Sequence, residues 1–385
     1  MKNLIRKNVS AITPYIASKP IEETKRELGL KKIIKLDANE NPLGASPKAI
    51  AAMRKRLSTV NRYPDNQGFY LKAKLAEYLS IEPANIVLGN GSDELIDVVI
   101  KTFVEEAENI ATADITFLEY KIISEINNHQ TITAPLKNFK YDLEAIKKKI
   151  DKKIKLVFIA NPNNPTGTYV TISELENFMR DLPADVVLVL DEAYDTFIDV
   201  DDFPKGQNYI MDKNVIVLKT FSKAYGLAGL RIGYSLAKPE FTSYMERVRQ
   251  PFNVNALAQA AATAALDDKD FLLKTRATVQ EGKKYLYDSL KELGLSYVPS
   301  VANFILVNAS RNCKANENYK KDELNAISLS NLEKELYGKP VSKKMLEYGV
   351  VVRDMEQYGL KNFIRVTVGR KEENERFIEV LKKIF

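Results

Sequence analysis

The chain has 385 residues, a length that suggests two or three domains, or one large domain with an appendage. Of these residues 45% are apolar and 28% are charged, proportions typical of an ordinary globular protein. Its formal charge of +6 comes from scattered lysines, which argues against nucleic-acid binding. The single cysteine, Cys313, excludes a disulfide framework and favours a reducing compartment, and the single histidine, His129, excludes a histidine-rich metal site. Because the N-terminus lacks a signal peptide's apolar core and no window could span a membrane, we expect a cytoplasmic protein.

Short apolar runs alternate with helical patterns through the first part of the chain. Strands are expected at residues 85–89, 155–160, 185–190 and 214–218, and helical patterns follow the first two of them at 93–107 and 171–182. The apolar runs are continuous in Val, Ile and Leu rather than alternating, which is typical of strands buried on both faces. The sequence therefore predicts a parallel α/β sheet with right-handed crossovers. A helical stretch at about 240–292 contains Pro251 and is expected to form at least two helices.

The pattern changes from Leu295 onward. Strands are expected within 296–309, 349–355 and 362–369, and a helix at 371–385 closes a smaller α+β unit. A polar, charged segment at 311–340 can hold a helix or be partly disordered. We therefore predict an N-terminal arm with part of the small domain at 1–38, a large domain at 39–275 and a small domain at 276–385.

The first two candidate motifs follow strands of the predicted sheet. Ligands of open α/β sheets gather at the carboxyl ends of the strands. After the strand at 85–89, NGSDE places Ser92 and Asp93 at a helix start, where free backbone N–H groups favour an anion such as phosphate. Taken alone, an ordinary capped turn is the better interpretation. After the strand at 155–160, NPNNPTG forms a stiff turn from which Asn164 can offer an amide to a ligand.

Two further motifs follow the next strands. DEAY places Asp191 at the end of an apolar run, so that its carboxylate is expected to be partly buried and to need a cationic partner, unless it caps a helix. Tyr194 lies three residues further on. TFSKAYGLAGLRIGY then sets Lys223 and Arg231 among small apolar residues. A lysine is rarely buried unless it is paired or used chemically, and an arginine suits a phosphate or carboxylate. The small apolar neighbours disfavour the alternative of a solvated surface pair.

Together these strand ends gather polar side chains around one crevice: Asn164, Asp191, Tyr194, Ser222, Lys223 and Arg231, with an anion site at Ser92. Pyridoxal phosphate needs a lysine for its Schiff base and an acidic residue at its pyridine nitrogen. It also needs donors to its phenolate oxygen and a cradle for its phosphate. The residues of the crevice match these needs, so the sequence indicates pyridoxal 5'-phosphate as the cofactor.

Here the sequence resembles the fold-type I aminotransferases, and most closely the histidinol-phosphate aminotransferases among them. The resemblance runs from about Ser10 to the C-terminus, apart from 311–340. It rests on the order and spacing of TPY, KLDANENPLG, RYPD, NGSDE, NPNNPTG, DEAY, TFSKAYGLAGLRIGY, ANFILV, VVVRD and FIRVTVG. It implies an α/β fold whose large domain holds a mostly parallel seven-stranded sheet, with a smaller α+β domain.

The resemblance also implies the roles of the cofactor-binding residues. Lys223 would form the Schiff base, Asp191 would keep the pyridine nitrogen protonated, and Phe117 would stack on the ring. Tyr194 and Asn164 would donate to the phenolate oxygen. Tyr63, in RYPD, would reach the phosphate from the neighbouring subunit, which implies an obligate homodimer with shared active sites. The phosphate would be held by Gly91, Ser92, Asp93, Thr220, Ser222 and Arg231.

For the substrate, the resemblance implies a pocket formed by Tyr15, Asn39, Tyr120, Arg353 and Arg365, in which the two arginines bind the anionic groups. Two features depart from the family pattern. Ile115 stands where family members usually carry a proline before the stacking aromatic residue, which bears on the geometry of that loop. The segment 311–340 is absent from the usual pattern and is expected to be a surface excursion, because loop length costs little free energy.

The implied activity is transfer of an amino group between glutamate and imidazole-acetol phosphate, the keto partner of histidinol phosphate, in histidine biosynthesis. Alternatives are an aromatic amino-acid transaminase and a decarboxylase of a phosphorylated amino acid. ANENPLG and the arginine of RVTVG resemble the transaminase pattern more than the decarboxylase pattern. A pyridoxal-phosphate sensor fused to a DNA-binding domain would need a helix-turn-helix, for which there is no room before TPY. A non-catalytic interaction protein would have no use for Lys223.

Overall fold

The computed structural model describes residues 4–14, 20–30, 32–310 and 338–385. The predicted excursion at 311–340 therefore lies almost wholly outside the described residues, as do Tyr15 and Cys313. Within the described ranges no helix combines the length and the apolar character that crossing a membrane would require.

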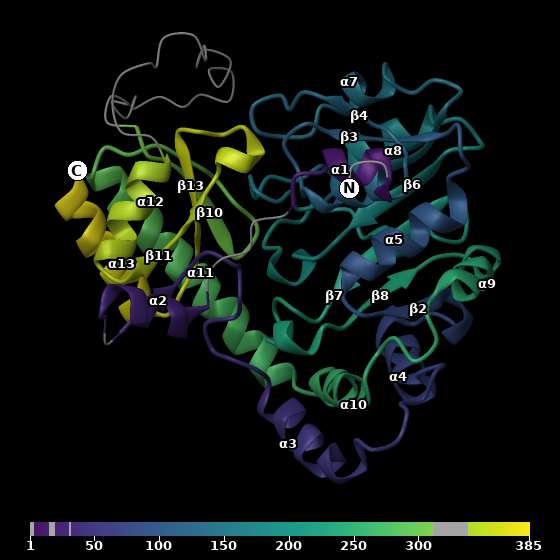
Figure 1. The fold of residues 1–385 in the computed structure, drawn as a ribbon, viewed down its shortest axis with the longest axis horizontal. Coiled ribbons are helices and arrows are strands. Elements are labelled where there is room, and N and C mark those ends of the chain that lie inside the picture. Colours follow the sequence, from purple (N-terminus) through teal and green to yellow (C-terminus); the bar gives the residue numbers. More distant parts are fainter. Residues whose placement is uncertain (1–3, 15–19, 31, 311–337) are drawn as a thin grey trace.

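A seven-stranded sheet forms the larger part of the molecule (Figure 1). Its order is β2-β8-β7-β6-β5-β3-β4, and β7, β6, β5, β3 and β4 run parallel, whereas β8 is antiparallel to both of its neighbours. This confirms the predicted α/β class with a mostly parallel sheet. The strands are β2 (Ile86–Gly89), β3 (Asn109–Ala113), β4 (Thr131–Ala134), β5 (Ile154–Ala160), β6 (Val187–Asp191), β7 (Val215–Thr220) and β8 (Gly233–Leu236).

Most helices of this part lie beside the sheet, whereas α3 lies away from it and packs against α10 (Figure 1). They are α3 (Pro47–Arg56), α4 (Phe69–Leu79), α5 (Ser92–Phe103), α6 (Glu119–Ile126), α7 (Leu143–Lys147), α8 (Ile172–Arg180), α9 (Pro239–Val248) and α10 (Ala256–Ala265). Local sequence explains where they begin. At α8, for example, Thr171 and Glu174 form a capping box that satisfies two free N–H groups. The stretch at 240–292, predicted to hold at least two helices, forms α9, α10 and α11 (Lys269–Glu292).

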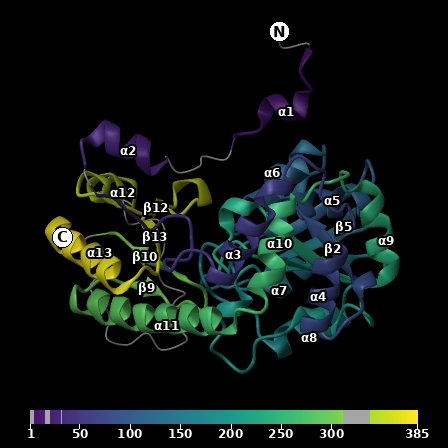
Figure 2. The ribbon, with the colours of Figure 1, turned by 90° about the horizontal axis from the view of Figure 1, so that it is seen from below.

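A second, four-stranded antiparallel sheet has the order β12-β13-β10-β9 and packs with α11, α12 and α13 (Figures 1 and 2). Residues 34–35 form β1 and pair in parallel with β11, so the N-terminal segment joins this C-terminal unit. The predicted boundary at 275 falls inside the unbroken helix α11, and the domain limits stay a prediction. The remaining elements are α1 (Lys7–Ala11), α2 (Ile21–Leu28), β1 (Ile34–Lys35), β9 (Tyr297–Val298), β10 (Phe304–Asn308), α12 (Gly338–Glu347), β11 (Val350–Val351), β12 (Arg353–Asp354), β13 (Phe363–Thr367) and α13 (Lys371–Ile384).

The carboxyl ends of β5, β6 and β7 lie side by side. Asp191, the last residue of β6, is in register with Ala160 of β5 and with Leu218 of β7. The chain then turns back from β7 into antiparallel β8, with Thr220 opposite Gly233. Residues 221–232 form this return connection, and a Cβ at Gly233 would lie 2.8 Å from the backbone nitrogen of Ser92. The fold therefore brings the loops after β2, β5, β6 and β7 to one edge of the sheet.

Candidate active site

A cavity of about 240 Å³ lies at this edge of the sheet. It is lined by residues from the loops after β2, β3, β5, β6 and β7, together with residues of the N-terminal segment and of β13. The structure brings together here most of the residues predicted from the sequence: Asn39, Ser92, Asp93, Phe117, Tyr120, Asn164, Asp191, Tyr194, Thr220, Ser222, Lys223, Arg231 and Arg365.

Lys223 lies on the return connection between β7 and β8. Its Nζ donates to the carbonyl oxygen of Ala38 at 3.2 Å and lies 5.7 Å from the centre of the Tyr194 ring. The amine is therefore held at the cavity by contacts with the N-terminal segment and with the loop after β6. It is half-buried, which leaves it accessible to a molecule in the cavity.

The Asp191 carboxylate is buried at the floor of the cavity and is held by two donors. Its Oδ2 accepts from the hydroxyl of Tyr120 at 2.7 Å, and its Oδ1 accepts from the backbone N–H of Ala193 at 3.1 Å. Burial raises the pKa of Asp191 to about 6, although both hydrogen bonds act to lower it. Burial also raises the pKa of the Tyr120 phenol well above its usual value, so that Tyr120 is a permanent donor. A carboxylate in this state is suited to a cationic partner inside the cavity.

Tyr120 was predicted to line the substrate pocket, and it does line the cavity. Its side chain is fully buried and its ring stacks on Phe158, with the ring centres 4.9 Å apart. Because its hydroxyl is bonded to Asp191, the direct contact of this group is with the acidic residue. Phe117 stands edge-on to Tyr120 at 5.6 Å and also lines the cavity. With Ile115 in place of the usual proline, Phe117 still lines the cavity, and its stacking role stays a prediction.

Two neighbouring donors face the cavity from the loops after β6 and β5. The Tyr194 oxygen accepts from Nδ2 of Asn39 at 3.0 Å, which leaves its own proton for a ligand. Burial raises the pKa of Tyr194, and the nearby Arg365 and the Asn39 bond counteract that rise. Asn164 accepts at Oδ1 from Nη1 of Arg365, which leaves its amide protons for a ligand. Asn39, predicted as a substrate residue, is buried and acts directly on Tyr194.

Arg365 is the buried cation of the cavity. The side chain comes from β13 and is 5% exposed, and its Nη2 donates to the carbonyl oxygen of Asp37 at 2.8 Å. Among the described residues no carboxylate forms an ion pair with it, and its Nε has no hydrogen-bond partner. A buried guanidinium with a free N–H is a strong site for a carboxylate or a phosphate group.

A second cationic site lies where the return connection meets the start of α5. Arg231 Nη2 lies 2.8 Å from Oδ2 of Asp93, and Nη1 donates to Ser222 Oγ at 3.5 Å. The Gly91 turn, residues 90–93, begins α5 without a side-chain cap, so N–H groups of the first helical turn remain for an anion. A Cβ at Gly91 would lie 2.6 Å from Arg231 Nη2, and the positive φ of 84° at this position also favours glycine. Thr220 Oγ1 completes the group by accepting from the Ser222 N–H.

Four of the predicted residues are not among those that line the cavity, and one of them, Gly91, directly precedes the lining residues Ser92 and Asp93. Tyr63 is 81% exposed on the loop between α3 and α4 and stacks on Phe252 with ring centres 4.7 Å apart. Arg353 lies opposite Arg365 in the antiparallel register of β12 and β13, so both leave the sheet on one face, and its Nη2 donates to Gln357 at 3.3 Å. Tyr15 lies outside the described residues. The roles of Tyr63, Arg353 and Tyr15 stay predictions, as do the roles of the residues that line the cavity.

Sequence reasoning missed the contribution of the backbone before Asn39. The carbonyl oxygens of Asp37 and Ala38 bind Arg365 and Lys223, and the backbone N–H of Asn39 donates to Thr367 at 2.9 Å. The motif KLDANENPLG was the available signal, but only its Asn39 was taken as a site residue. Backbone acceptors carry no residue-type signature, so only the fold could identify them.

The fold and this site define an aminotransferase. Residues 31–381 match the family described as aminotransferase class I and II, and the chain belongs to that family. It is 41% identical to the histidinol-phosphate aminotransferase of Moorella thermoacetica, covering 98% of this chain and 92% of the relative, and 42% identical to histidinol-phosphate aminotransferase 1 of Nitrosococcus oceani, covering 98% and 95%. Among solved structures, histidinol-phosphate aminotransferase from Sinorhizobium meliloti in complex with pyridoxal-5'-phosphate has 26% identity and a TM-score of 0.84, covering 99% of this chain and 98% of that one. The predicted fold-type I architecture is confirmed.

Proposed function

We propose that the chain is a pyridoxal-phosphate-dependent transaminase that acts in the cytoplasm, in histidine biosynthesis. It would transfer an amino group between two amino/keto pairs. One pair is L-glutamate and 2-oxoglutarate, and the other is histidinol phosphate and imidazole-acetol phosphate. The observation that carries the proposal is that Lys223 and Arg231, from the return connection after β7, and Asp191, from the end of β6, line one cavity. The names of the relatives that are 40–42% identical support the choice of substrate.

The residues of the cavity fit pyridoxal phosphate at each of its polar groups. Asp191 would face the pyridine nitrogen, Tyr194 and Asn164 would donate to the phenolate oxygen, and Phe117 would cover the ring. The phosphate would take the N–H groups of the Gly91 turn, with Arg231 and the hydroxyls of Thr220 and Ser222. When bound, the cofactor supplies an electron sink for the substrate's α-carbon.

In the structure the Asp93 carboxylate is paired with the guanidinium of Arg231, where the cofactor's phosphate would bind. A phosphate at Arg231 would lie close to the Asp93 carboxylate, and two anions repel each other. The Asp93 side chain would therefore have to leave Arg231, while its backbone N–H would remain available at the start of α5. Exchange of one anion for another keeps the guanidinium paired in both states.

Lys223 would hold the cofactor covalently and would then act on the substrate. Once an amino substrate has displaced it, its amine would carry a proton to and from the substrate's α-carbon. The Ala38 carbonyl, 3.2 Å from Nζ, orients that amine. The ring of Tyr194, 5.7 Å away, favours the charged form after proton uptake. Ala38 and Tyr194 lie on other segments of the chain, so these two contacts would remain when Lys223 changes its bonding.

Arg365 would bind an anionic group of each amino substrate, a carboxylate of glutamate and the phosphate of histidinol phosphate. Glutamate and histidinol phosphate both carry an anion, so one guanidinium can serve each in turn. The free Nε and the absence of an ion pair among the described residues support this role for Arg365. Arg353 would add a second charge from the same face of the small sheet, which suits a phosphate more than a carboxylate.

The proposed assembly is a homodimer in which each subunit lends Tyr63 to the other's active site. Tyr63 does not line the cavity of its own chain, and it is strongly exposed. Further large apolar side chains are exposed on the same segment and the adjoining loop, namely Leu57, Val60, Phe69, Tyr70 and Phe252. Exposed apolar side chains gathered in this way are typical of an interaction surface, and we propose that a second copy of the chain binds there.

Half-reactions on the purified protein test the substrate. Histidinol phosphate and phenylalanine are each titrated into the cofactor-loaded protein, and loss of the bound cofactor's absorbance is followed. We expect histidinol phosphate to react at lower concentration and faster than phenylalanine. A preference for phenylalanine would assign the chain to the aromatic transaminases, and release of CO2 from a phosphorylated amino acid would assign it to the decarboxylases.

Hybrid dimers test the shared site. A Tyr63→Phe chain and a Lys223→Ala chain are each expected to be impaired alone. Mixing them should restore one site per hybrid, in which Lys223 comes from one chain and Tyr63 from the other. A monomer that is fully active under sedimentation control would contradict the assembly while leaving the proposed chemistry intact.

A further inference from the structure

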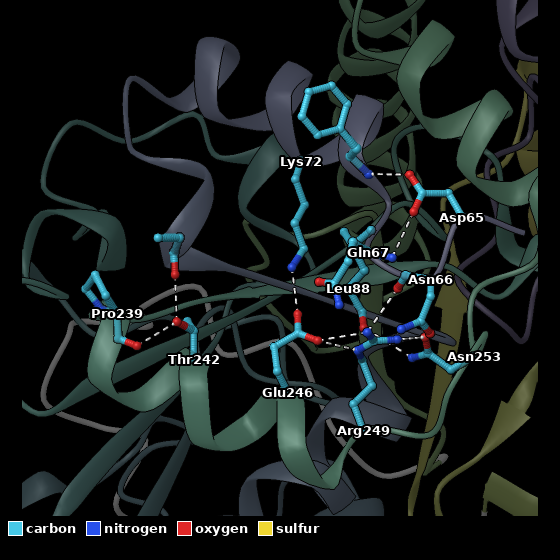
Figure 3. A network of polar contacts seen from close by, with 12 residues as sticks. Asp65, Asn66, Gln67, Lys72, Leu88, Pro239, Thr242, Glu246, Arg249 and Asn253 are labelled. Carbon is cyan, nitrogen blue, oxygen red and sulfur yellow. Dashed lines mark hydrogen bonds and ion pairs between the residues drawn. The ribbon is translucent and has the colours of Figure 1, made fainter.

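Tyr63 lies within a loop, residues 60–68, that contains no helix or strand. Its ring stacks on Phe252, with the ring planes 23° apart, but neither side chain is buried. An exposed stacking pair cannot by itself hold a loop in one conformation. Something buried must therefore position the loop, and Figure 3 shows a polar network that includes Asp65, Asn66 and Gln67 of this loop.

Arg249 is the centre of this network. It follows α9 directly and is 8% exposed. Its guanidinium donates to the carbonyl oxygen of Asn66 at 3.0 Å, to Asn253 Oδ1 at 2.6 Å and to Glu246 Oε2 at 2.8 Å (Figure 3). The contact with Asn66 reaches the Tyr63 loop, and the contact with Asn253 reaches the loop that carries Phe252. One buried planar group thus binds both of the loops that carry the exposed pair.

The Tyr63 loop is held to the same region by three further bonds. Asn66 Oδ1 accepts from the backbone N–H of Phe252 at 2.6 Å, and the carbonyl oxygen of Asp65 accepts from Gln259 at 2.8 Å. Asp65 Oδ2 accepts from the N–H of Phe69, at the start of α4 (Figure 3). The loop is therefore attached to the segment after α9 and to α10 by bonds to its backbone and to Asn66.

The network continues from Asn253 to the Gly91 turn. Asn253 Nδ2 donates to the carbonyl oxygen of Leu88 at 3.2 Å and to Glu94 Oε2 at 2.6 Å. The same Glu94 oxygen accepts from the backbone N–H of Asn90 at 2.5 Å. Glu94 lies in the first turn of α5, beside Ser92 and Asp93 of the cavity. A continuous chain of hydrogen bonds thus runs from the Tyr63 loop through Arg249 and Asn253 to the turn that begins α5.

We propose that Arg249 is a positioning residue with two targets: the Gly91 turn of its own active site and the Tyr63 loop that its subunit lends to the partner's site. This inference rests on the proposed function and its shared site. In the dimer, each cofactor phosphate would then depend on Arg249 from both chains. The copy in its own chain would set the backbone N–H groups, and the copy in the other chain would set the tyrosine hydroxyl.

The geometry of the contacts makes Arg249→Lys the informative change. A lysine keeps the positive charge beside Glu246 but has one ammonium group in place of a planar fork, so it cannot reach the carbonyl of Asn66 and the amide of Asn253 together. Arg247→Lys is the matched control. Arg247 lies two residues earlier, is exposed, and stacks over the Tyr244 ring at 4.6 Å.

The experiment uses hybrid dimers in which one chain carries Lys223→Ala and an affinity tag. Only the other chain can fix pyridoxal phosphate with borohydride, so the fixed cofactor reports one working site. Arg249→Lys is placed either on the working chain, where it affects that site's own Gly91 turn, or on the Lys223→Ala chain, where it affects only the lent Tyr63 loop. The pyridoxal phosphate concentration for half-maximal fixation is measured for each hybrid.

We expect this concentration to rise about tenfold for each placement, because small displacements of binding groups are costly. Arg247→Lys should leave it unchanged in both. If only the placement on the working chain has an effect, the proposal that Arg249 positions the lent Tyr63 loop is wrong. If neither placement has an effect, Arg249 does not position either target and the whole proposal is wrong. If Arg249→Lys fails to fold, Asn253→Ala removes the connection to the Gly91 turn but keeps the bond from Arg249 to Asn66, so an effect is expected only when it is placed on the working chain. Tyr63→Phe on the Lys223→Ala chain is the separate check. If it leaves the working site unchanged, the shared site itself is refuted, and the inference falls with it.

Discussion

The hydroxyl of Tyr120 lies 2.7 Å from Oδ2 of Asp191, and Tyr120 is the one side chain among the described residues that donates to this carboxylate. Both residues are buried, one in the first turn of α6 and the other at the end of β6. The bond fixes the carboxylate in a single orientation. It also opposes the effect of burial, which raises the pKa of Asp191 to about 6. The tyrosine thus controls both the direction and the ionisation of the acidic residue.

Removing this bond in Tyr120→Phe should raise the pKa of Asp191 further, because burial then acts with less opposition. The ionised carboxylate would be the partner of the cofactor's pyridinium, so affinity for pyridoxal phosphate should fall as pH drops through about 6 in the wild type. In Tyr120→Phe the fall should begin at a higher pH. Equilibrium dialysis of pyridoxal phosphate at a series of pH values measures this, and the difference between the proteins cancels the cofactor's own titration.

In the cofactor-free protein, Asp191 should affect folding stability in the opposite direction: its contribution should be greater at low pH. The folded pKa of about 6 lies above the ordinary value of 3.8, so the folded state binds the proton more tightly than the unfolded state. The contribution of Asp191 to stability is therefore present at low pH and is lost as pH rises from about 4 to 6.

Tyr141→Phe is the control for the affinity profile of Tyr120→Phe, since Tyr141 is also buried but bonds to Thr112, Thr116 and the Ala160 N–H. An identical shift of the affinity profile in Tyr141→Phe would contradict a specific role for Tyr120.

The residues at strand ends could be predicted because each one breaks a local pattern. Lys223 and Arg231 stand among small apolar residues, and Asp191 ends a continuous apolar run. The groups that orient them could not be predicted in this way. Tyr120 is 71 residues from Asp191, and Asn39 is 155 residues from Tyr194, so no spacing rule connects the pairs. Such partners are defined by sheet order and loop length, which only the fold supplies.

The missed strands have a similar explanation. Strand prediction relied on continuous Val, Ile and Leu, which identified β5, β6 and β7. The strands β3 and β4 read NIATA and TITA and are rich in alanine and threonine. The strand β8 reads GYSL and begins with glycine, which is unfavourable in strands. They are strands because their neighbours in the sheet pair with them, so tertiary structure outweighs weak local preference.

Lys219 and Glu192 form a buried ion pair at 2.7 Å beside the active-site strands, and Asp195 is bonded to the same amine. Burial lowers the pKa of Lys219, but the adjacent carboxylates outweigh burial and hold the pKa well above its usual value. Lys219→Met should destabilise the cofactor-free protein by about 3–5 kcal/mol, because it removes the cation paired with the buried Glu192 carboxylate, which then keeps its bond from the Gly206 N–H but has no cationic partner in Lys219. Adding Glu192→Gln should recover part of the loss. Urea unfolding of the four proteins gives the coupling energy, and strictly additive effects would contradict a coupled pair.

Lys223→Ala should separate cofactor binding from chemistry. The phosphate-binding groups, Asp191 and the phenolate donors all remain, so the variant should still bind pyridoxal phosphate reversibly. It should lose transamination by several orders of magnitude, because it has neither the covalent link nor the proton carrier. Borohydride followed by peptide mapping should place the pyridoxyl group on Lys223 in the wild type and on no peptide in the variant. A wild-type digest without a pyridoxyl peptide would contradict the cofactor assignment.

The two arginines of the small sheet should differ in their effects on the two half-reactions. Arg365 is buried and in contact with Asn164, and its Nε is free, so Arg365→Ala should impair glutamate and histidinol phosphate alike, by about 2–4 kcal/mol each. Arg365→Lys keeps the charge without the fork and should recover only part of that loss. Arg353 lies outside the cavity lining but opposite Arg365 in the sheet. Arg353→Gln should therefore impair histidinol phosphate more than glutamate, since the additional charge matters most for a phosphate. Single-turnover kinetics with each substrate measure the differences, and small, equal effects of Arg353→Gln on both would remove Arg353 from the substrate site.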